Sequence, residues 1–249
     1  MNKMQLVIPM SGFGERFRRE GYKVPKPLIE IEGKPIIAHV LDIFPKIEKV
    51  IFICNKEHIN SKELTLYNTL IKLAPNSKIV EIDTHKKGPI YAVLQSIDYI
   101  DKKLPTIVNY CDFNCIWNFE AFKRYLTKKD PDGCVVSYTG FHPHMLGNTN
   151  YAYLKVKGER VDDIQEKKPF TKEPMNELAS SGTYYFKSGQ IMENYFKEVI
   201  KRDLNIKGEF YVSLAYKPMI EDGLKIGYFL LEHFMQWGTP SDFEEYKWF

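Results

Sequence analysis

A loop with two glycines near the amino end is the first place where this chain could do chemistry. Gly12 and Gly14 follow a short apolar run, residues 5–10, and share their loop with Met10 and Ser11. Glycine lets the backbone approach a ligand closely and direct its N–H groups toward anionic oxygens. The loop matches neither the P-loop pattern nor the full dinucleotide-binding pattern. It is therefore a candidate phosphate-binding loop of another type.

Basic side chains follow the glycine loop closely. They are Arg16, Arg18, Arg19, Lys23 and Lys26. Pro25 and Pro27 flank Lys26 and fix the backbone on either side of it. Together with the glycines, this cluster favours the binding of a polyphosphate. The alternative is a solvated basic turn, since runs of charge usually lie at the surface.

A carboxylate follows another predicted strand, residues 106–110. The carboxyl ends of parallel strands meet at one edge of a sheet, so Asp112 should face the same crevice as the glycine loop. A hard oxygen ligand in that position suits Mg²⁺ bridging nucleotide phosphates. Alternatively, Asp112 caps a helix near residues 118–126, a role that Asn114 or Asn118 could fill equally well.

Gly88 and Pro89 begin a further helical pattern. A glycine at this point gives backbone groups access to a base or a ribose, and the alternative is an ordinary first turn of a helix.

The elements that position these residues alternate between strand and helix. Apolar runs typical of buried strands lie at residues 5–10, 50–54, 78–82 and 106–110, with helical patterns at 35–44 and 88–100. Such alternation predicts a parallel sheet covered by helices on both faces. The fold class is therefore α/β and Rossmann-like, with ligands bound at the loops after the strands.

The second half has a different pattern. Strand-like runs lie at residues 133–139, 151–156, 181–186 and 224–231, with helices near 190–204 and 209–221. This pattern predicts a mixed sheet that extends the first. We expect one domain over residues 1–249. Residues 1–130 would form a nucleotide-binding half, and residues 131–249 an acceptor-binding half, the acceptor being a second substrate. A last helix, residues 241–249, begins at Ser241 as its expected cap.

Composition excludes several classes of protein. The 249 residues carry a formal net charge of +3, so the surface as a whole has no strong positive field that would attract nucleic acids in general. No apolar stretch approaches the roughly 20 residues that span a bilayer, and no export signal is recognised. The few cysteines lie in or beside apolar runs and fit a reduced, cytoplasmic protein without a zinc site. They are Cys54, Cys111, Cys115 and Cys134.

The motifs in their order resemble a known superfamily. Gly-x-Gly-x-Arg-Phe followed by Pro-Lys-Pro-Leu is similar to the signature of nucleotidyltransferases that activate sugar phosphates, the pyrophosphorylase superfamily. Gly88, Asp112, Lys167, the segment 181–184 and the segment 238–240 continue the resemblance in order. It implies a GT-A-like nucleotidyltransferase fold and nucleotidyl transfer from an NTP to a phosphorylated acceptor, with release of pyrophosphate.

The resemblance also implies roles for single residues. The loop from Met10 to Gly14, with Gly88 and Pro89, would bind the nucleotide. Arg16, Lys26, Asp112 and Lys167 would be catalytic, with Asp112 holding Mg²⁺ and Lys167 orienting the acceptor phosphate. The remaining acceptor contacts would come from Glu166, Ser181, Gly182, His142 and His144, although both histidines could equally be structural.

One position departs from the superfamily pattern. Gln236 stands where an aspartate usually precedes Gly-Thr-Pro, so Glu232 is the nearest acidic candidate for a second metal ligand. Residues 138–145 and 236–240 resemble, more narrowly, capsule-locus cytidylyltransferases that activate phosphoglutamine on the route to capsular phosphoramidate. That resemblance implies CTP and L-glutamine phosphate as substrates. The residues themselves fix neither the base, nor the acceptor, nor the oligomeric state.

Besides a nucleotidyltransferase that uses a sugar 1-phosphate, two other functions remain open. Asp112-Phe113-Asn114 loosely resembles a metal-binding Asp-x-Asp, which would suit a glycosyltransferase that uses a ready-made nucleotide sugar. Gln236 would also be compatible with a non-catalytic nucleotide-binding regulatory protein. Arg16 and Lys26, which suit a free triphosphate, argue against the glycosyltransferase. The presence of Arg16, Lys26 and Asp112 together argues against a protein without catalytic activity.

Overall fold

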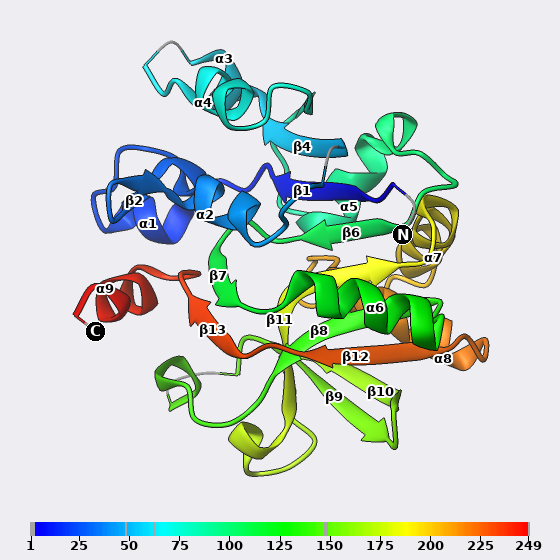
Figure 1. The fold of residues 1–249 in the computed structure, drawn as a ribbon. Coiled ribbons are helices and arrows are strands. Elements are labelled where there is room, and N and C mark those ends of the chain that lie inside the picture. The colour runs from blue at the N-terminus through cyan, green and yellow to red at the C-terminus, as the bar shows by residue number, and fades with distance from the viewer. Residues whose placement is uncertain (1–2, 48, 62, 147–148, 249) are drawn as a thin grey trace.

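Four parallel strands form the amino-terminal half of the central sheet (Figure 1). The computed structural model describes residues 3–47, 49–61, 63–146 and 149–248. The strands lie in the order β5-β4-β1-β6, so β1 is central. Their bounds are β1 Gln5–Met10, β4 Lys49–Asn55, β5 Lys78–Ile82 and β6 Thr106–Asn109.

The same sheet continues into the carboxyl-terminal half through an antiparallel strand. β11 (Leu178–Phe186) pairs with β8 along one edge, and with β6 and β9 along the other. The remaining strands of this half are β8 Gly133–Tyr138, β9 Ala152–Lys157, β10 Arg160–Glu166 and β12 Ile226–Leu230. The predicted mixed sheet is thereby confirmed. Two small antiparallel pairs lie beside it, β2 (Glu30–Ile31) with β3 (Lys34–Pro35) and β7 (Phe113–Ile116) with β13 (His233–Gln236).

Helices cover both faces of the sheet, as the sequence predicts. Successive residues of β1 point to opposite sides, so Leu6 and Ile8 join one apolar cluster and Val7 joins the other. α2 and α6 pack on the first cluster, and α5, α7 and α8 on the second. The helices are α1 Glu15–Arg19, α2 Ile36–Asp42, α3 Lys56–Asn60, α4 Leu66–Leu73, α5 Gly88–Gln95, α6 Phe119–Lys129, α7 Gly189–Lys201, α8 Tyr216–Glu221 and α9 Pro240–Trp248.

One predicted helix is wrong in its first turn. The chain is not helical at residues 209–211, and only a 3₁₀ turn (Val212–Ala215) followed by α8 occupies the rest of the predicted range 209–221. The backbone of Phe210 is used elsewhere: its N–H donates to Lys87 O and its carbonyl accepts from Ile90 N–H, both at 3.0 Å. Residue 210 therefore binds a neighbouring segment instead of closing a helical turn.

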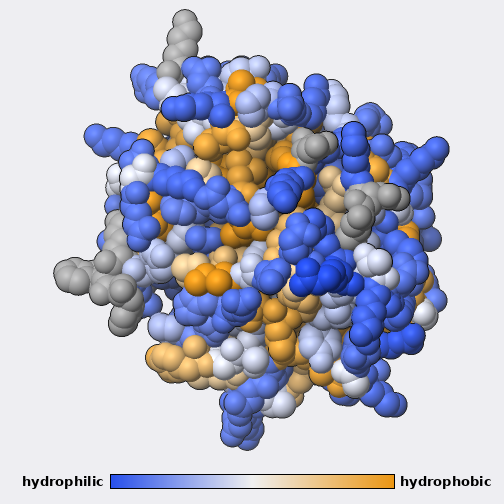
Figure 2. Space-filling model, in the orientation of Figure 1, coloured by the Kyte–Doolittle hydropathy of each residue, from blue (hydrophilic) through white to orange (hydrophobic). Residues whose placement is uncertain are grey.

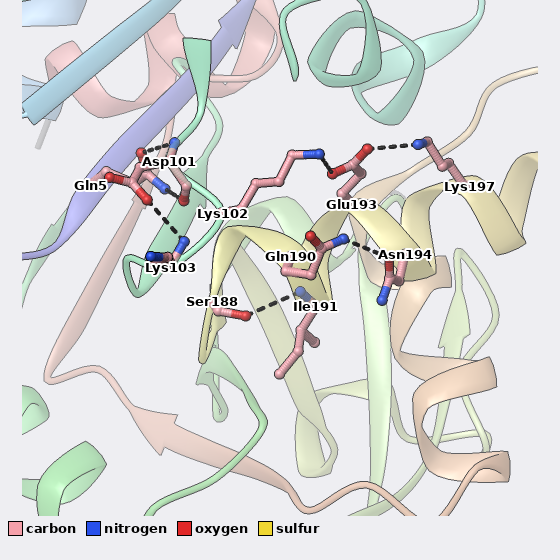
Figure 3. A network of polar contacts seen from close by, with 10 residues as sticks. All are labelled: Gln5, Asp101, Lys102, Lys103, Ser188, Gln190, Ile191, Glu193, Asn194 and Lys197. Carbon is pink, nitrogen blue, oxygen red and sulfur yellow. Dashed lines mark hydrogen bonds and ion pairs between the residues drawn. The ribbon is translucent and has the colours of Figure 1, made fainter. Parts of the chain in front are cut away.

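A polar network holds the end of the sheet that lies opposite the glycine loop (Figure 3). The side chain of Gln5 donates to Asp101 O at 2.7 Å and to Thr106 Oγ1 at 2.8 Å, and accepts from Asp101 N–H at 3.0 Å. Ser188 caps α7 by accepting from Ile191 N–H, and Glu193 pairs with two lysines of its surroundings. The contacts of Gln5 join the amino ends of β1 and β6, and the carboxyl ends of these strands lie at the opposite edge of the sheet, where a site is expected.

None of the helices in the described residues is both long and apolar enough to cross a bilayer. Figure 2 shows hydrophilic side chains over most of one face, with apolar side chains exposed between them.

Candidate active site

Two adjoining cavities open at the carboxyl ends of the central strands. The outer cleft, of about 550 Å³, contains every residue that the sequence assigns to the nucleotide. The inner pocket, of about 170 Å³, contains four of the six residues assigned to the acceptor. Residues common to both cavities are Arg16, Tyr110, Asp112, Tyr211 and Gly238. A ligand in the outer cleft therefore shares walls with a ligand in the inner pocket.

The glycine loop forms one wall of the outer cleft. Gly14 has a φ of 62°, in the left-handed region that favours glycine, and α1 begins directly after it. A Cβ at Gly12 would meet no protein atom within 4 Å. Packing therefore does not require glycine at position 12, whereas close approach of a ligand would.

Lys26 lies between the glycine loop and Asp112. Its Nζ donates to Asp112 Oδ2 at 2.8 Å and to the carbonyl oxygen of Gly238 at 2.8 Å, and its side chain is only 15% exposed. Pro25 and Pro27 flank it as predicted, and a short 3₁₀ turn (Lys26–Leu28) begins there. The ammonium is thus held at a fixed place in the outer cleft.

Asp112 lies in the connection between β6 and β7. Its backbone carbonyl accepts from Trp237 N–H at 3.1 Å, so the β7–β13 pair fixes its position. It does not cap the following helix, because Asn118 Oδ1 accepts the Ala121 N–H at 2.8 Å. The carboxylate therefore has no structural duty as a helix cap.

Arg16 reaches both cavities from the first turn of α1. Arg16 is exposed and lines both the outer cleft and the inner pocket. This placement lets one guanidinium approach phosphates in either cavity.

Gly88 is required by packing of the chain on itself. Its φ is +81°, and a Cβ there would lie 2.7 Å from Phe210 N and 3.0 Å from Phe210 O. Gly88 and Pro89 line the outer cleft at the start of α5, as predicted. The glycine thus admits the backbone of Phe210, a reason that the sequence alone does not suggest.

Glu166 and Lys167 form the inner wall of the pocket at the end of β10. Glu166 is buried and accepts from Ser213 Oγ at 2.6 Å, and burial raises the pKa of its carboxyl to about 7. Lys167 has a φ of +58° and donates from Nζ to Tyr211 Oη at 2.5 Å. Burial lowers the pKa of Lys167, which Glu166 and Glu209 partly oppose. The neighbouring Lys168 is exposed and does not line the pocket, so Lys167 is the one of these two lysines that lies there.

Ser181 and Gly182 reach the pocket from an irregularity in β11. The pairing of β11 with β8 shifts register between Ser180 and Thr183, and Gly182 has a φ of +100° at this point. Ser181 Oγ donates to Val136 O, and the carbonyl of Gly182 accepts from Tyr110 N–H, both at 3.0 Å. The bulge therefore turns this part of the strand into a wall of the inner pocket.

The structure corrects the prediction for Glu232. This residue is exposed, lies in the bend before β13, and donates its N–H to Ile116 O at the far end of the β7–β13 pair. Four residues of strand separate that end from Asp112, about 13 Å at the usual rise. Glu232 is therefore too far from Asp112 to share a metal ion with it.

His142 and His144 are not among the described residues that line the inner pocket. His144 is buried, shares a hydrogen bond of 3.0 Å with Tyr138 Oη and packs against Tyr151 and Phe234. Burial, assisted by His142, lowers its pKa to about 3, so it is neutral at ordinary pH. The structure therefore favours a structural role for these histidines over a role in acceptor binding. Tyr151 lies between their cluster and the pocket.

Asp242 is a carboxylate of the inner pocket that sequence reasoning missed. It is 9% exposed, and its Oδ2 has no hydrogen-bond partner among the described residues. Burial raises its pKa, opposed by hydrogen bonds from Thr239 and Gln236. The cap of α9 is also different from the prediction, because Thr239 Oγ1, not Ser241, accepts from Asp242 N–H at 3.2 Å. An acidic residue four positions after Gly238 was the available signal.

The described residues contain no group of three or more histidine, cysteine or acidic side chains arranged for a metal ion. A metal ion that needs three or more protein ligands therefore does not fit the described residues. Mg²⁺ does fit them, because it is commonly held by one or two carboxylates together with phosphates and water. The orphaned Oδ2 of Asp242 and the carboxylate of Asp112 supply donors of that kind.

Fold and site together define a nucleotidyltransferase architecture. The family model for nucleotidyl transferase matches residues 6–246, so the chain belongs to this family.

Particular relatives give the match more detail. The bifunctional protein GlmU of Clostridioides difficile is 26% identical over 230 residues, which are 90% of this chain and 46% of that protein. GlmU of Methanocaldococcus jannaschii is 25% identical over 243 residues, 97% of this chain and 53% of that protein. The chain therefore spans about half the length of the curated relatives it matches.

Known structures share the fold at low sequence identity. A nucleoside-diphosphate-sugar pyrophosphorylase from Vibrio cholerae has a TM-score of 0.79 at 22% identity, covering 97% of this chain and 98% of the other. The CTP:phosphocholine cytidylyltransferase LicC from Streptococcus pneumoniae has a TM-score of 0.72 at 17% identity, covering 99% and 98%. An inositol-1-phosphate CTP transferase from T. maritima has 0.74 at 12%, covering 96% and 91%.

Proposed function

We propose that this protein transfers a nucleoside monophosphate from an NTP to a phosphorylated small molecule and releases pyrophosphate. The observation that supports this most is the pair of adjoining cavities that share Arg16 and Asp112. One cavity has a glycine loop and Lys26, and the other has Lys167. A triphosphate in the first and an acceptor phosphate in the second would meet beside Asp112.

The proposed chemistry needs positioning more than proton transfer. An oxygen of the acceptor phosphate attacks the α-phosphorus in line, a phosphoanhydride forms, and pyrophosphate leaves. The attacking oxygen is already ionised, so no side-chain base is required. Backbone N–H groups of the loop 11–14 and Arg16 hold the β- and γ-phosphates, and Lys26 stabilises charge that develops at the α-phosphoryl group. Lys167 orients the acceptor phosphate.

Mg²⁺ is the proposed cofactor. Asp112 would hold it together with phosphate oxygens and water, and Asp242 is a further carboxylate in the same pocket. Bound there, the ion would neutralise phosphate charge and orient the triphosphate. The rest of the proposal does not require a second protein ligand for Mg²⁺.

For substrates, we propose CTP and L-glutamine phosphate, on a route to capsular phosphoramidate. Support comes from the resemblance of residues 138–145 and 236–240 to the capsule-locus cytidylyltransferases. The fold shared with LicC is compatible with a cytidylyltransferase. The fold shared with the nucleoside-diphosphate-sugar pyrophosphorylase from Vibrio cholerae is compatible with a sugar 1-phosphate instead, which is the second candidate. The four free cysteines fit the cytoplasm, where we propose that the reaction takes place.

Release of pyrophosphate by the purified protein with Mg²⁺ tests this function. CTP, UTP, dTTP, ATP and GTP would each be combined with L-glutamine phosphate, phosphocholine and several sugar 1-phosphates. Turnover with one pair would establish nucleotidyl transfer and name both substrates. Cleavage of a nucleoside diphosphate sugar without pyrophosphate release would support a glycosyltransferase, and tight NTP binding without turnover would support a regulatory protein.

A further inference from the structure

A short segment between α7 and α8 contacts both cavities. We call residues 209–213 the strap. Its residues line both cavities or bind their walls: Glu209 lines the outer cleft, Tyr211 lines the cleft and the pocket, and Ser213 binds Glu166. None of these residues carries a function in the mechanism above.

Phe210 fixes the strap to the nucleotide side. Its N–H donates to Lys87 O and its carbonyl accepts from Ile90 N–H, both at 3.0 Å. Because Gly88 has no Cβ, the two segments approach closely enough for both bonds. The strap is thus joined by main chain to the turn that begins α5.

Tyr211 fixes the strap to the acceptor side. Lys167 Nζ donates to Tyr211 Oη at 2.5 Å and lies 4.2 Å from the centre of its ring. Tyr211 Oη in turn donates to Glu209 Oε2 at 3.0 Å. A carboxylate that accepts a hydrogen bond from the hydroxyl makes the phenol oxygen a better acceptor for the ammonium, because hydrogen bonds in a chain polarise one another. The ammonium of a long, flexible lysine is thereby held at one place.

The next two residues secure the strap to the same wall. Val212 N–H donates to Tyr110 Oη at 3.2 Å, and Ser213 Oγ donates to Glu166 at 2.6 Å. Tyr110 lines both cavities and Glu166 lines the inner pocket. The position of Tyr211 is therefore fixed from both sides along the chain.

We propose that Tyr211 is a positioning residue for the acceptor phosphate: its hydroxyl, oriented by Glu209, holds the Lys167 ammonium at the inner pocket. The proposal rests on the proposed function for the identity of the anion that Lys167 meets. The hydrogen-bond chain itself does not depend on turnover. Removal of the hydroxyl should therefore change the chemistry of Lys167 even in a protein without an identified substrate.

The substitution Tyr211→Phe tests the proposal, since it keeps the ring and removes one oxygen. Tyr195→Phe is the matched control, because Tyr195 Oη donates to Asp222 at 2.9 Å in the same tyrosine-to-carboxylate manner and lines neither cavity. In the full-length protein, the rate at which acetic anhydride labels Lys167 would be followed by mass spectrometry. Inorganic phosphate would serve as the protecting anion.

In Tyr211→Phe we expect Lys167 to be labelled several times faster, because the ammonium loses an acceptor and the side chain gains freedom. Half-protection should require about 10-fold more phosphate, the scale expected for the loss of one hydrogen bond to a charged group. With an active substrate pair, KM for the acceptor should rise by a similar factor while KM for the NTP stays within twofold. Tyr195→Phe should change none of these values.

Unchanged labelling and unchanged phosphate protection in Tyr211→Phe would overturn the proposal, whatever the activity. If labelling and protection change but no substrate pair turns over, the positioning role stands and the proposed function fails. If turnover is found and both KM values rise equally, Tyr211 acts on the whole site and the assignment to the acceptor phosphate is wrong. A shift of the same size in Tyr195→Phe would show a general effect of lost tyrosine hydroxyls and would also refute the proposal.

Discussion

Lys26 in the outer cleft forms an ion pair of 2.8 Å with Asp112, which lines both cavities of the site. The pair joins two segments that are far apart in the sequence, and the Lys26 ammonium also binds the carbonyl oxygen of Gly238. Neither partner is fully buried, since their side chains are 15% and 32% exposed. An anionic group can therefore reach the ammonium of Lys26, and a cation can reach the carboxylate of Asp112.

Lys26→Ala should lower kcat by at least about 10²–10³-fold while the protein stays folded. Loss of one preorganised donor that stabilises developing charge has an effect of this order. Lys187→Ala is the control, because Lys187 also pairs with an aspartate, Asp130, at 2.8 Å but lines neither cavity. Initial rates of pyrophosphate release and the circular dichroism spectrum would be measured for both. A Lys26→Ala rate within threefold of wild type would remove Lys26 from the mechanism.

Asp242→Asn should raise the Mg²⁺ concentration for half-maximal activity by roughly 10-fold or more, the scale on which polar groups around a metal alter its affinity. The substitution preserves shape and removes one negative charge from the inner pocket. Glu232→Gln is the matched control, since Glu232 is exposed and distant from Asp112. Binding of Mn²⁺ followed by electron paramagnetic resonance gives a readout that does not depend on turnover. Equal Mn²⁺ affinities of the Asp242→Asn and wild-type proteins would mean that Asp242 does not help Asp112 to hold the ion.

Gly88→Ala should destabilise the fold more than Gly223→Ala. Both glycines have a φ near +80°, so both alanines meet backbone strain of about 1 kcal/mol. A Cβ at position 88 would also lie 2.7 Å from Phe210 N, whereas a Cβ at position 223 meets nothing within 4 Å. With this overpacking, we expect a cost of about 2–4 kcal/mol for Gly88→Ala. Urea unfolding of the two variants measures the difference, and equal costs would show that Phe210 moves aside freely.

The parts of the fold that rest on local patterns could be predicted from the sequence. Each of the four parallel strands of the first half contains a short apolar run, and the glycine loop with Lys26 carries its own turn and proline signals. The cleft residues assigned to the nucleotide lie next to these elements in the chain. Local sequence therefore determines where they are placed.

Other parts depend on contacts between distant segments. Asp242 reaches the inner pocket because β13 pairs with β7 and brings the start of α9 beside Asp112. Proximity to Gln236 along the chain favoured Glu232, but the antiparallel pair carries that residue to the opposite end. Tyr211 was hidden inside a predicted helix, since the pattern does not show that Phe210 binds the turn at Gly88. Such pairings have no signal in the residues themselves.

Glu166→Gln should remove a pH dependence from the stability of the protein. Burial raises the pKa of Glu166 from an ordinary value of 4.5 to about 7, so the folded protein holds a proton there that the unfolded chain has released. Between about pH 4.5 and 7 the folded state therefore binds more protons, and this carboxyl's contribution to stability, complete below that window, is lost as pH rises through it. Free energies of unfolding in urea would be compared at several pH values for wild type and Glu166→Gln. The difference between the two curves isolates this carboxyl from the other titrating groups, and a difference that does not change with pH would mean that Glu166 is ionised in the folded protein throughout.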